Sequence, residues 1–130
     1  MIDPVADFLI RIKNAYLAKK KETIIPFSKL KKEISLLLKK ENLIEDFSIE
    51  GKVANKRIKM ILKYQDGRPS LSGVKMISKQ GRRVYKGYSE LYPDKNNHRL
   101  AILTTSKGLI TDREAKKTKI GGEVICEIYE

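Results

Sequence analysis

The chain has 130 residues, a length that fits one compact domain or two small ones. It carries 28 lysines and arginines against 16 aspartates and glutamates, a formal net charge of +12, while apolar residues make up 41% and suffice for a core. This excess favours a polyanionic partner, with nucleic acid the first candidate and an anionic membrane surface the second. One cysteine and one histidine exclude an internal disulfide and a cysteine zinc site.

Enzyme classes and membrane spans are also unsupported. The sequence shows no Ser/His/Asp order, paired acids or metal-ligand spacing, so we expect no enzyme, no metal and no cofactor. Neither an apolar run of roughly 20 residues nor a signal peptide is present, so a reducing cytoplasm is expected. The net charge is +7 over residues 1–72 and +5 over residues 73–130, which favours folded basic faces over a basic tail.

Two helices are predicted in the first half of the chain. Asp3 can cap the first, Pro4 suits its first turn, and the helix should fade in residues 18–21. Ser28 can cap the second, and Asn42 is a suitable left-handed stop. Helical spacing predicts buried faces made of Val5, Phe8, Leu9, Ile12 and Tyr16, and of Leu30, Ile34, Leu37 and Leu38.

Short strands are predicted between and after these helices. Residues 23–27 read as a strand that Pro26 confines to an edge or ends, because proline lacks an N–H donor. Residues 43–50 and 57–64 follow, separated by a turn at Gly51, and in the latter Ile58, Met60, Leu62 and Tyr64 share one face. The order predicts helices packed on a three-stranded sheet.

A cluster of turn-forming residues at 66–70 indicates a boundary. We expect an α/β fold of the α+β type, with an N-terminal α/β domain over 1–66 and a mainly β domain over 67–130. Strands are predicted at 74–78, 83–86, 100–104 and 123–129. Thr111 followed by Glu114 is a capping box that begins a short helix, and Gly121-Gly122 returns the chain to the last strand. Cys126 alternates with apolar neighbours there and should lie in the core.

The strongest functional signal is a loop of three hydroxyls, an ammonium and a glycine. Such side chains donate to phosphate, ribose 2′-OH and base edges, and the glycine permits close approach and positive φ. A plain polar surface turn is the alternative. A nucleotide phosphate loop is rejected because no upstream glycine precedes the lysine. The loop consists of Thr104, Thr105, Ser106, Lys107 and Gly108.

Three weaker signals accompany it. In residues 82–88, basic residues alternate with tyrosines, which suits stacking on RNA unless those tyrosines pack on the core. Glu123 could accept from base amino groups, or pair with Lys107 or Arg113 and only order the loop. Residues 29–32, with Arg11 and Asn14, form a basic surface or merely a solvated helix face.

Taken together, residues 104–108, 111–115 and 121–124 resemble the C-terminal signature of the eighth small-subunit ribosomal protein family of bacteria. Residues 3–7, 11–15, 25–31 and 83–86 agree, in collinear order over the whole chain. The resemblance implies two small α/β domains and binding to the central domain of 16S rRNA, beside neighbouring small-subunit ribosomal proteins. It also implies repression of translation through the messenger RNA of the protein's own operon.

The resemblance further implies which residues bind RNA. Thr104 stands where the family usually has serine, and residues 94–99 replace a glycine-containing approach to the strand. The competing classes are a DNA-packaging or messenger-binding protein that acts off the ribosome, and a protein–protein adaptor with solubilising lysines. The RNA-binding residues implied are Thr104, Thr105, Ser106, Lys107, Gly108, Tyr85, Lys86, Gly122, Glu123, Arg11, Asn14, Lys29 and Lys32.

Overall fold

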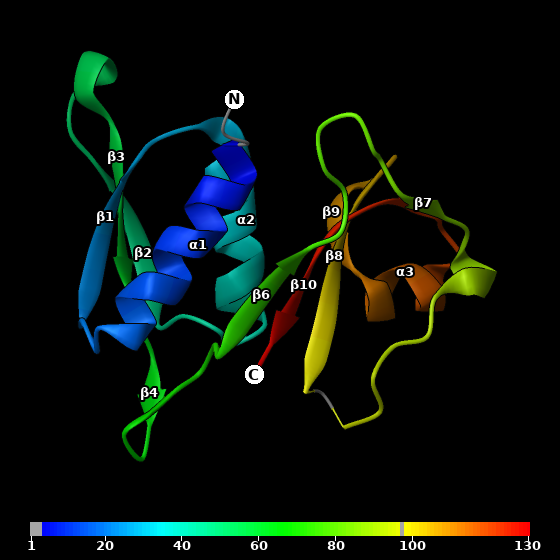
Figure 1. Cartoon of the computed structure of the whole chain (residues 1–130). Helices are drawn as coiled ribbons and strands as arrows, with labels where there is room; N and C mark the ends of the chain where they lie inside the picture. Colours follow the sequence, from blue (N-terminus) through cyan, green and yellow to red (C-terminus); the bar gives the residue numbers. More distant parts are fainter. Residues whose placement is uncertain (1–3, 97) are drawn as a thin grey trace. The chain divides into compact units, whose positions relative to one another are not determined.

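The computed structural model of the chain describes residues 4–96 and 98–130, so the cap expected at Asp3 lies outside it. Helices and antiparallel sheets alternate along the chain, which confirms the mixed α/β class (Figure 1). The chain divides into two compact units, one ending at Ser72 and the other formed by Gly73–Glu130. The sequence placed its boundary after Asp66.

The N-terminal unit packs two helices on a three-stranded antiparallel sheet, as predicted. Its elements are α1 (Pro4–Leu17), β1 (Glu22–Pro26), α2 (Lys29–Lys40), β2 (Asp46–Glu50), the 3-10 turn η1 (Val53–Asn55) and β3 (Arg57–Ile61). The strand order β1-β3-β2 makes β1 an edge strand, where Pro26 is tolerated. Figure 1 shows α1 and α2 beside one face of this sheet. On the other face Lys59 pairs with Glu22 and Glu50.

Both ends of α2 follow the sequence prediction. The Ser28 hydroxyl caps the helix, and Asn42 ends it in the left-handed conformation at φ 61°. The amide of Leu43 then donates to the carbonyl of Leu38 at 2.9 Å. Leu43 therefore completes the helix stop, and the strand predicted from that residue begins only at Asp46.

The predicted core of this unit is mostly confirmed. Leu30 was expected to face inward, but 40% of its surface is exposed. It lies in the first turn of α2, and helical spacing defines a face of the helix without showing how far along the axis the core extends. The buried residues that were predicted are Phe8, Leu9, Ile12, Tyr16, Ile34, Leu37, Leu38, Ile58, Met60 and Leu62.

The turn cluster at residues 66–70 closes a small hairpin before the second unit. Asp66 and Gly67 both have positive φ and join β4 (Tyr64–Gln65) to β5 (Arg68–Pro69).

The C-terminal unit is built on a sheet of order β6-β10-β8-β9, with β7 also paired to β10. All pairings are antiparallel, and β9, which the sequence did not predict, forms a hairpin with β8. The elements are β6 (Gly73–Met76), β7 (Tyr85–Lys86), the 3-10 turn η2 (Tyr88–Glu90), β8 (Arg99–Thr105), β9 (Gly108–Thr111), α3 (Asp112–Thr118) and β10 (Gly122–Tyr129).

α3 packs on this sheet over a small apolar core. Thr111 caps the helix, as the sequence predicts, by accepting from the Glu114 amide at 3.2 Å. The reciprocal bond of a full capping box, from the Thr111 amide to the Glu114 carboxylate, is not formed. Cys126 is fully buried, and burial raises the pKa of its thiol to about 12, so it serves packing rather than reaction. The core cluster consists of Leu91, Ala101, Leu103, Ala115 and Val124.

Candidate nucleic-acid interface

The hydroxyl loop is the tip of the β8–β9 hairpin. Thr105 pairs with Gly108 across the hairpin, so Ser106 and Lys107 form a two-residue turn. The Thr105 hydroxyl accepts from the Lys107 amide at 3.1 Å and donates to the Gly108 carbonyl at 2.9 Å. Gly108 has φ +94°, the positive value expected of it. Thr105 therefore holds the turn in shape, while the Ser106 and Lys107 side chains are exposed at its tip.

Three of the sequence signals meet in one row across the sheet. In register, Tyr85 of β7 lies opposite Glu123 of β10, and Glu123 lies opposite Thr104 of β8. Directly opposed residues of antiparallel strands point to the same face. The tyrosine, the carboxylate and the hydroxyl therefore stand side by side. We call Tyr85, Glu123, Thr104 and the adjoining tip residues Ser106 and Lys107 the recognition row.

The two glycines before Glu123 allow the strands of this row to approach closely. A Cβ on Gly122 would lie 2.2 Å from the Thr104 carbonyl oxygen, and one on Gly121 would lie 2.6 Å from that of Lys86. Neither glycine has positive φ, so space and not backbone conformation requires them. The two glycines of the Gly-Gly-Glu segment therefore allow β7 and β8 to pack closely on either side of β10.

A serine that the sequence analysis did not single out fixes β7 against β10. The buried Ser78 hydroxyl donates to the Val124 carbonyl at 2.6 Å and accepts from the Val84 amide at 3.0 Å. Val84 precedes Tyr85, so these bonds position the start of the recognition row. Ser78 lies just after β6, and a single serine there gives no sequence signal of such a role.

The ion pair at Glu123 differs from both alternatives considered. Its carboxylate lies 3.5 Å from the Nη1 of Arg83, and not beside Lys107 or Arg113. The Arg113 guanidinium instead donates to the Asp94 carbonyl at 3.2 Å. Arg83 comes from the same basic segment as Tyr85, and only long-range strand pairing brings it to Glu123.

The exposed tyrosine of the row is available for stacking. Tyr85 is 69% exposed, which excludes the alternative that it packs on the core. Lys86 beside it is also exposed and points to the opposite face, because successive strand residues alternate. The row thus combines an open aromatic ring, hydroxyl groups, a fixed carboxylate and the flanking cations Arg83 and Lys107, which suit RNA stacking, hydrogen bonding and phosphate neutralisation.

The four N-terminal residues implied by the resemblance lie on the other unit. Arg11 and Asn14 are exposed on α1, where Arg11 pairs with Asp7 at 3.6 Å, and Lys29 and Lys32 are exposed on α2. Within the described residues, no hydrogen bond or ion pair joins any of the four to another. They are exposed cations and an amide on two helices, while the nine C-terminal residues cluster at one end of a sheet.

Other kinds of site find no support in the part of the chain that the structure describes. Residues 4–96 and 98–130 contain no group of three or more histidine, cysteine or acidic side chains able to hold a metal. None of the described helices combines the length and apolar character needed to span a bilayer.

Comparison with known proteins identifies the family. Residues 3–129 match the family described as ribosomal protein S8. The chain is 47% identical to small ribosomal subunit protein uS8 of Persephonella marina, over 98% of each chain. It is 44% identical to the protein of that name in Nitratidesulfovibrio vulgaris, over 99% of each chain. For that of Mycoplasma mobile the identity is 42%, over 98% of this chain and 96% of the relative.

These matches place the chain among ribosomal proteins, the non-enzymatic, rRNA-binding components of the translation apparatus. They extend over nearly its whole length, as the collinear resemblance implied. More narrowly, the chain belongs to the ribosomal protein S8 family.

Proposed function

We propose that the chain is a structural component of the small ribosomal subunit that binds the central domain of 16S rRNA. The observation that carries this is the recognition row, in which Tyr85, Glu123 and Thr104 stand in register beside the Ser106-Lys107 tip. The relatives are named small ribosomal subunit proteins, which supports the assembly. In this proposal the protein lies in the cytoplasm, within the ribosome, and contacts neighbouring proteins of the small subunit.

Each unit has a distinct part in this proposal. The row holds both hydrogen-bond donors and hydrogen-bond acceptors in fixed positions, so it supplies specificity for a folded RNA helix. The exposed Arg11, Lys29 and Lys32 of the N-terminal unit supply charge that neutralises phosphates without reading sequence. A messenger RNA of the protein's own operon that folds into the same helix would occupy the same row, which would repress its translation.

Ser106 provides the direct test of the row. Its hydroxyl makes no hydrogen bond within the described residues, so Ser106→Ala leaves the turn intact and removes only a group offered to RNA. Loss of one hydrogen bond to a polar partner costs about 1–2 kcal/mol. We therefore expect binding to a central-domain fragment of 16S rRNA to weaken roughly 5- to 30-fold in a filter-binding titration.

Two controls make this test specific. Ser48→Ala removes an exposed hydroxyl from the outer face of the N-terminal sheet and should leave the affinity unchanged. A scrambled transcript of equal length should bind both variants as it binds the unchanged protein. Equal affinity of the Ser106 variant and the unchanged protein for the central-domain fragment would remove this residue from the interface.

A further inference from the structure

A second aromatic and cationic surface lies on the C-terminal unit, on the face of the sheet that carries α3. Tyr92 is 77% exposed, and the Nζ of Lys116 lies 5.4 Å from the centroid of its ring. The Tyr92 backbone is held, because Arg99 donates to its carbonyl at 3.1 Å and the preceding Leu91 is buried. The ring therefore meets an ammonium while most of its surface stays open to solvent.

This surface is separate from the recognition row. Val124 lies next to Glu123 in β10, and Lys86 lies next to Tyr85 in β7. Neighbouring residues of a strand point to opposite faces. Val124 and Lys86 both line a pocket beside Tyr92, so that pocket opens on the face opposite the row.

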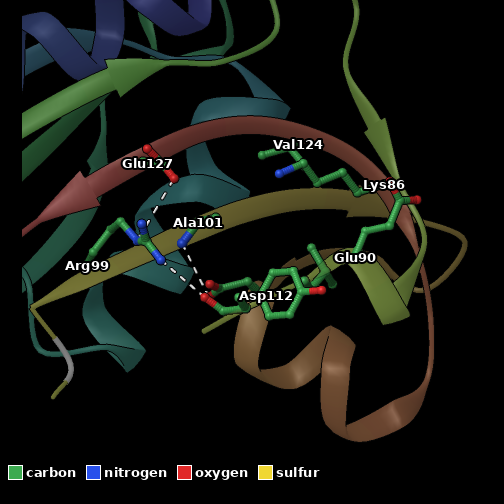
Figure 2. Close-up of a pocket in the computed structure, with 9 residues that line it drawn as sticks. Lys86, Glu90, Arg99, Ala101, Asp112, Val124 and Glu127 are labelled. Carbon is green, nitrogen blue, oxygen red and sulfur yellow. Dashed lines mark hydrogen bonds and ion pairs between the residues drawn. The ribbon is translucent and has the colours of Figure 1, made fainter. Parts of the chain in front are cut away.

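Figure 2 shows the residues that line this pocket. Its volume is about 210 Å³. Drug-sized ligands occupy pockets of about 300–1,000 Å³, so this one suits a smaller group. Its polar lining comprises three carboxylates and two cations, which are Glu90, Asp112, Glu127, Lys86 and Arg99. Carboxylates thus outnumber cations inside it.

The three carboxylates are fixed by the fold and keep unused acceptor capacity. Asp112 accepts from the amides of Ala101 and Arg113, and Glu90 accepts from the Gly87 amide at 3.0 Å. Glu127 lies 3.9 Å from the guanidinium of Arg99. A carboxylate can accept about four hydrogen bonds, so each remains able to accept from a ligand.

The charge inside the pocket is opposite to the charge outside it. The exposed side chains of α3 and its C-terminal cap are mainly cationic, namely Arg113, Lys116, Lys117 and Lys119 against Glu114. A phosphate would be repelled from the acidic pocket and attracted to the helix surface. A flat, neutral group with N–H donors is the complement of the pocket, and an aromatic face is the complement of Tyr92.

We propose that this pocket takes one unpaired RNA base that carries an amino group, with the base stacked on Tyr92 and its amino edge directed to the pocket carboxylates. The phosphates of the same strand lie along Lys116 and Lys117. The inference rests on the proposed function in that the base belongs to an RNA bound by this chain, but it uses a different face of the C-terminal unit.

The test uses the full chain and labelled RNA pentamers in a fluorescence anisotropy titration. One pentamer is all adenosine, and the other is all purine riboside, which lacks the 6-amino group. The adenosine pentamer should bind about tenfold more tightly. Tyr92→Ala should weaken its binding about tenfold, the scale of one stacked base, whereas Tyr92→Phe should retain it. Because Tyr92 is exposed, neither substitution affects the core.

Ser48→Ala is the control, since it alters an exposed residue of the N-terminal sheet that belongs to neither proposed RNA surface. It should leave pentamer binding unchanged, just as Tyr92→Ala should leave the preference for the central-domain fragment over the scrambled transcript unchanged. Equal binding of the two pentamers, or unaltered adenosine binding by Tyr92→Ala, would overturn the pocket proposal. Failure of Ser106→Ala to weaken binding of the central-domain fragment would remove Ser106 from the recognition row and would leave the pocket proposal standing.

Discussion

Tyr16 joins three segments of the N-terminal unit through one hydroxyl group. The hydroxyl donates to the carbonyl of Leu43 and accepts from the amide of Lys63 at 3.1 Å, and the side chain is almost fully buried. Its ring also meets that of Tyr64 edge to face, with centroids 5.4 Å apart. Burial raises the pKa of Tyr16 to about 12, so the group stays neutral at physiological pH.

Tyr16→Phe should therefore destabilise the fold without altering its packing. The substitution keeps the ring but leaves the Leu43 carbonyl and Lys63 amide without their partner, a cost of about 1–3 kcal/mol. Urea unfolding should show this as a lower midpoint with an unchanged slope. Tyr85→Phe, on an exposed ring, should change the free energy of unfolding by less than about 0.5 kcal/mol. Equal midpoints for Tyr16→Phe and the unchanged protein would contradict this account.

Sequence pattern predicts such residues only in part. Helical spacing identified Tyr16 as buried because repeat spacing reports the face of a helix. The partners of its hydroxyl are 27 and 47 residues away, and nothing local indicates them. The same limit explains why the pairing of Glu123 with Arg83, 40 residues apart, was not among the alternatives considered.

The ends of the helices also include some features that the local sequence predicts and others that it does not. Each α-helix in the described part of the chain stops at a left-handed residue: Lys19, Asn42 or Lys119. Asn42 was predicted because asparagine tolerates this conformation, whereas the lysines carry no such signal. The hairpin of β8 and β9 was missed for a related reason. Its hydroxyl tip was interpreted as a loop, although a glycine with positive φ directly after a tight turn, here Gly108, is typical of a hairpin with a glycine bulge.

The close approach of β8 and β10 can be tested at Gly122. A Cβ there would lie 2.2 Å from the Thr104 carbonyl oxygen and 2.9 Å from Cγ2 of Thr105, so Gly122→Ala must push the strands apart. We expect a loss of about 1–3 kcal/mol in the free energy of unfolding, the scale of overpacking. Binding to the central-domain fragment should weaken more than this loss explains, because Thr104 moves out of the recognition row.

Gly73→Ala is a suitable control for this change. It adds the same methyl group to a neighbouring strand, β6, where the nearest atom is a side-chain carbon of Tyr129 at 3.7 Å. Both stability and RNA binding should stay close to those of the unchanged protein. If the two alanine variants behaved alike, the close strand approach would have no part in forming the row.

For the whole molecule, the composition of the chain predicted its class of partner, whereas the sequence did not predict how distant segments pair. The net charge of +12, spread over both halves of the chain, indicated a polyanionic partner and folded basic faces. Order along the chain also predicted the mixed α/β class, because local spacing reports helices and strands. Strand order did not follow from the sequence, since pairing depends on contacts between distant segments. The convergence of residues 85, 104 and 123 in one row is such a contact.

The roles proposed for the two units in RNA binding predict a distinct salt response for each. Lys29 is an exposed cation on α2, so Lys29→Ala should remove about one phosphate contact. The slope of log K against log salt concentration should become shallower by about one unit, and the central-domain fragment and the scrambled transcript should lose affinity alike. Lys59→Ala removes a lysine already paired with Glu22 and Glu50 and should leave the slope unchanged. An unaltered slope for the Lys29 variant would show that this lysine faces only solvent, and the phosphate contacts of the N-terminal unit would then have to come from Arg11 and Lys32.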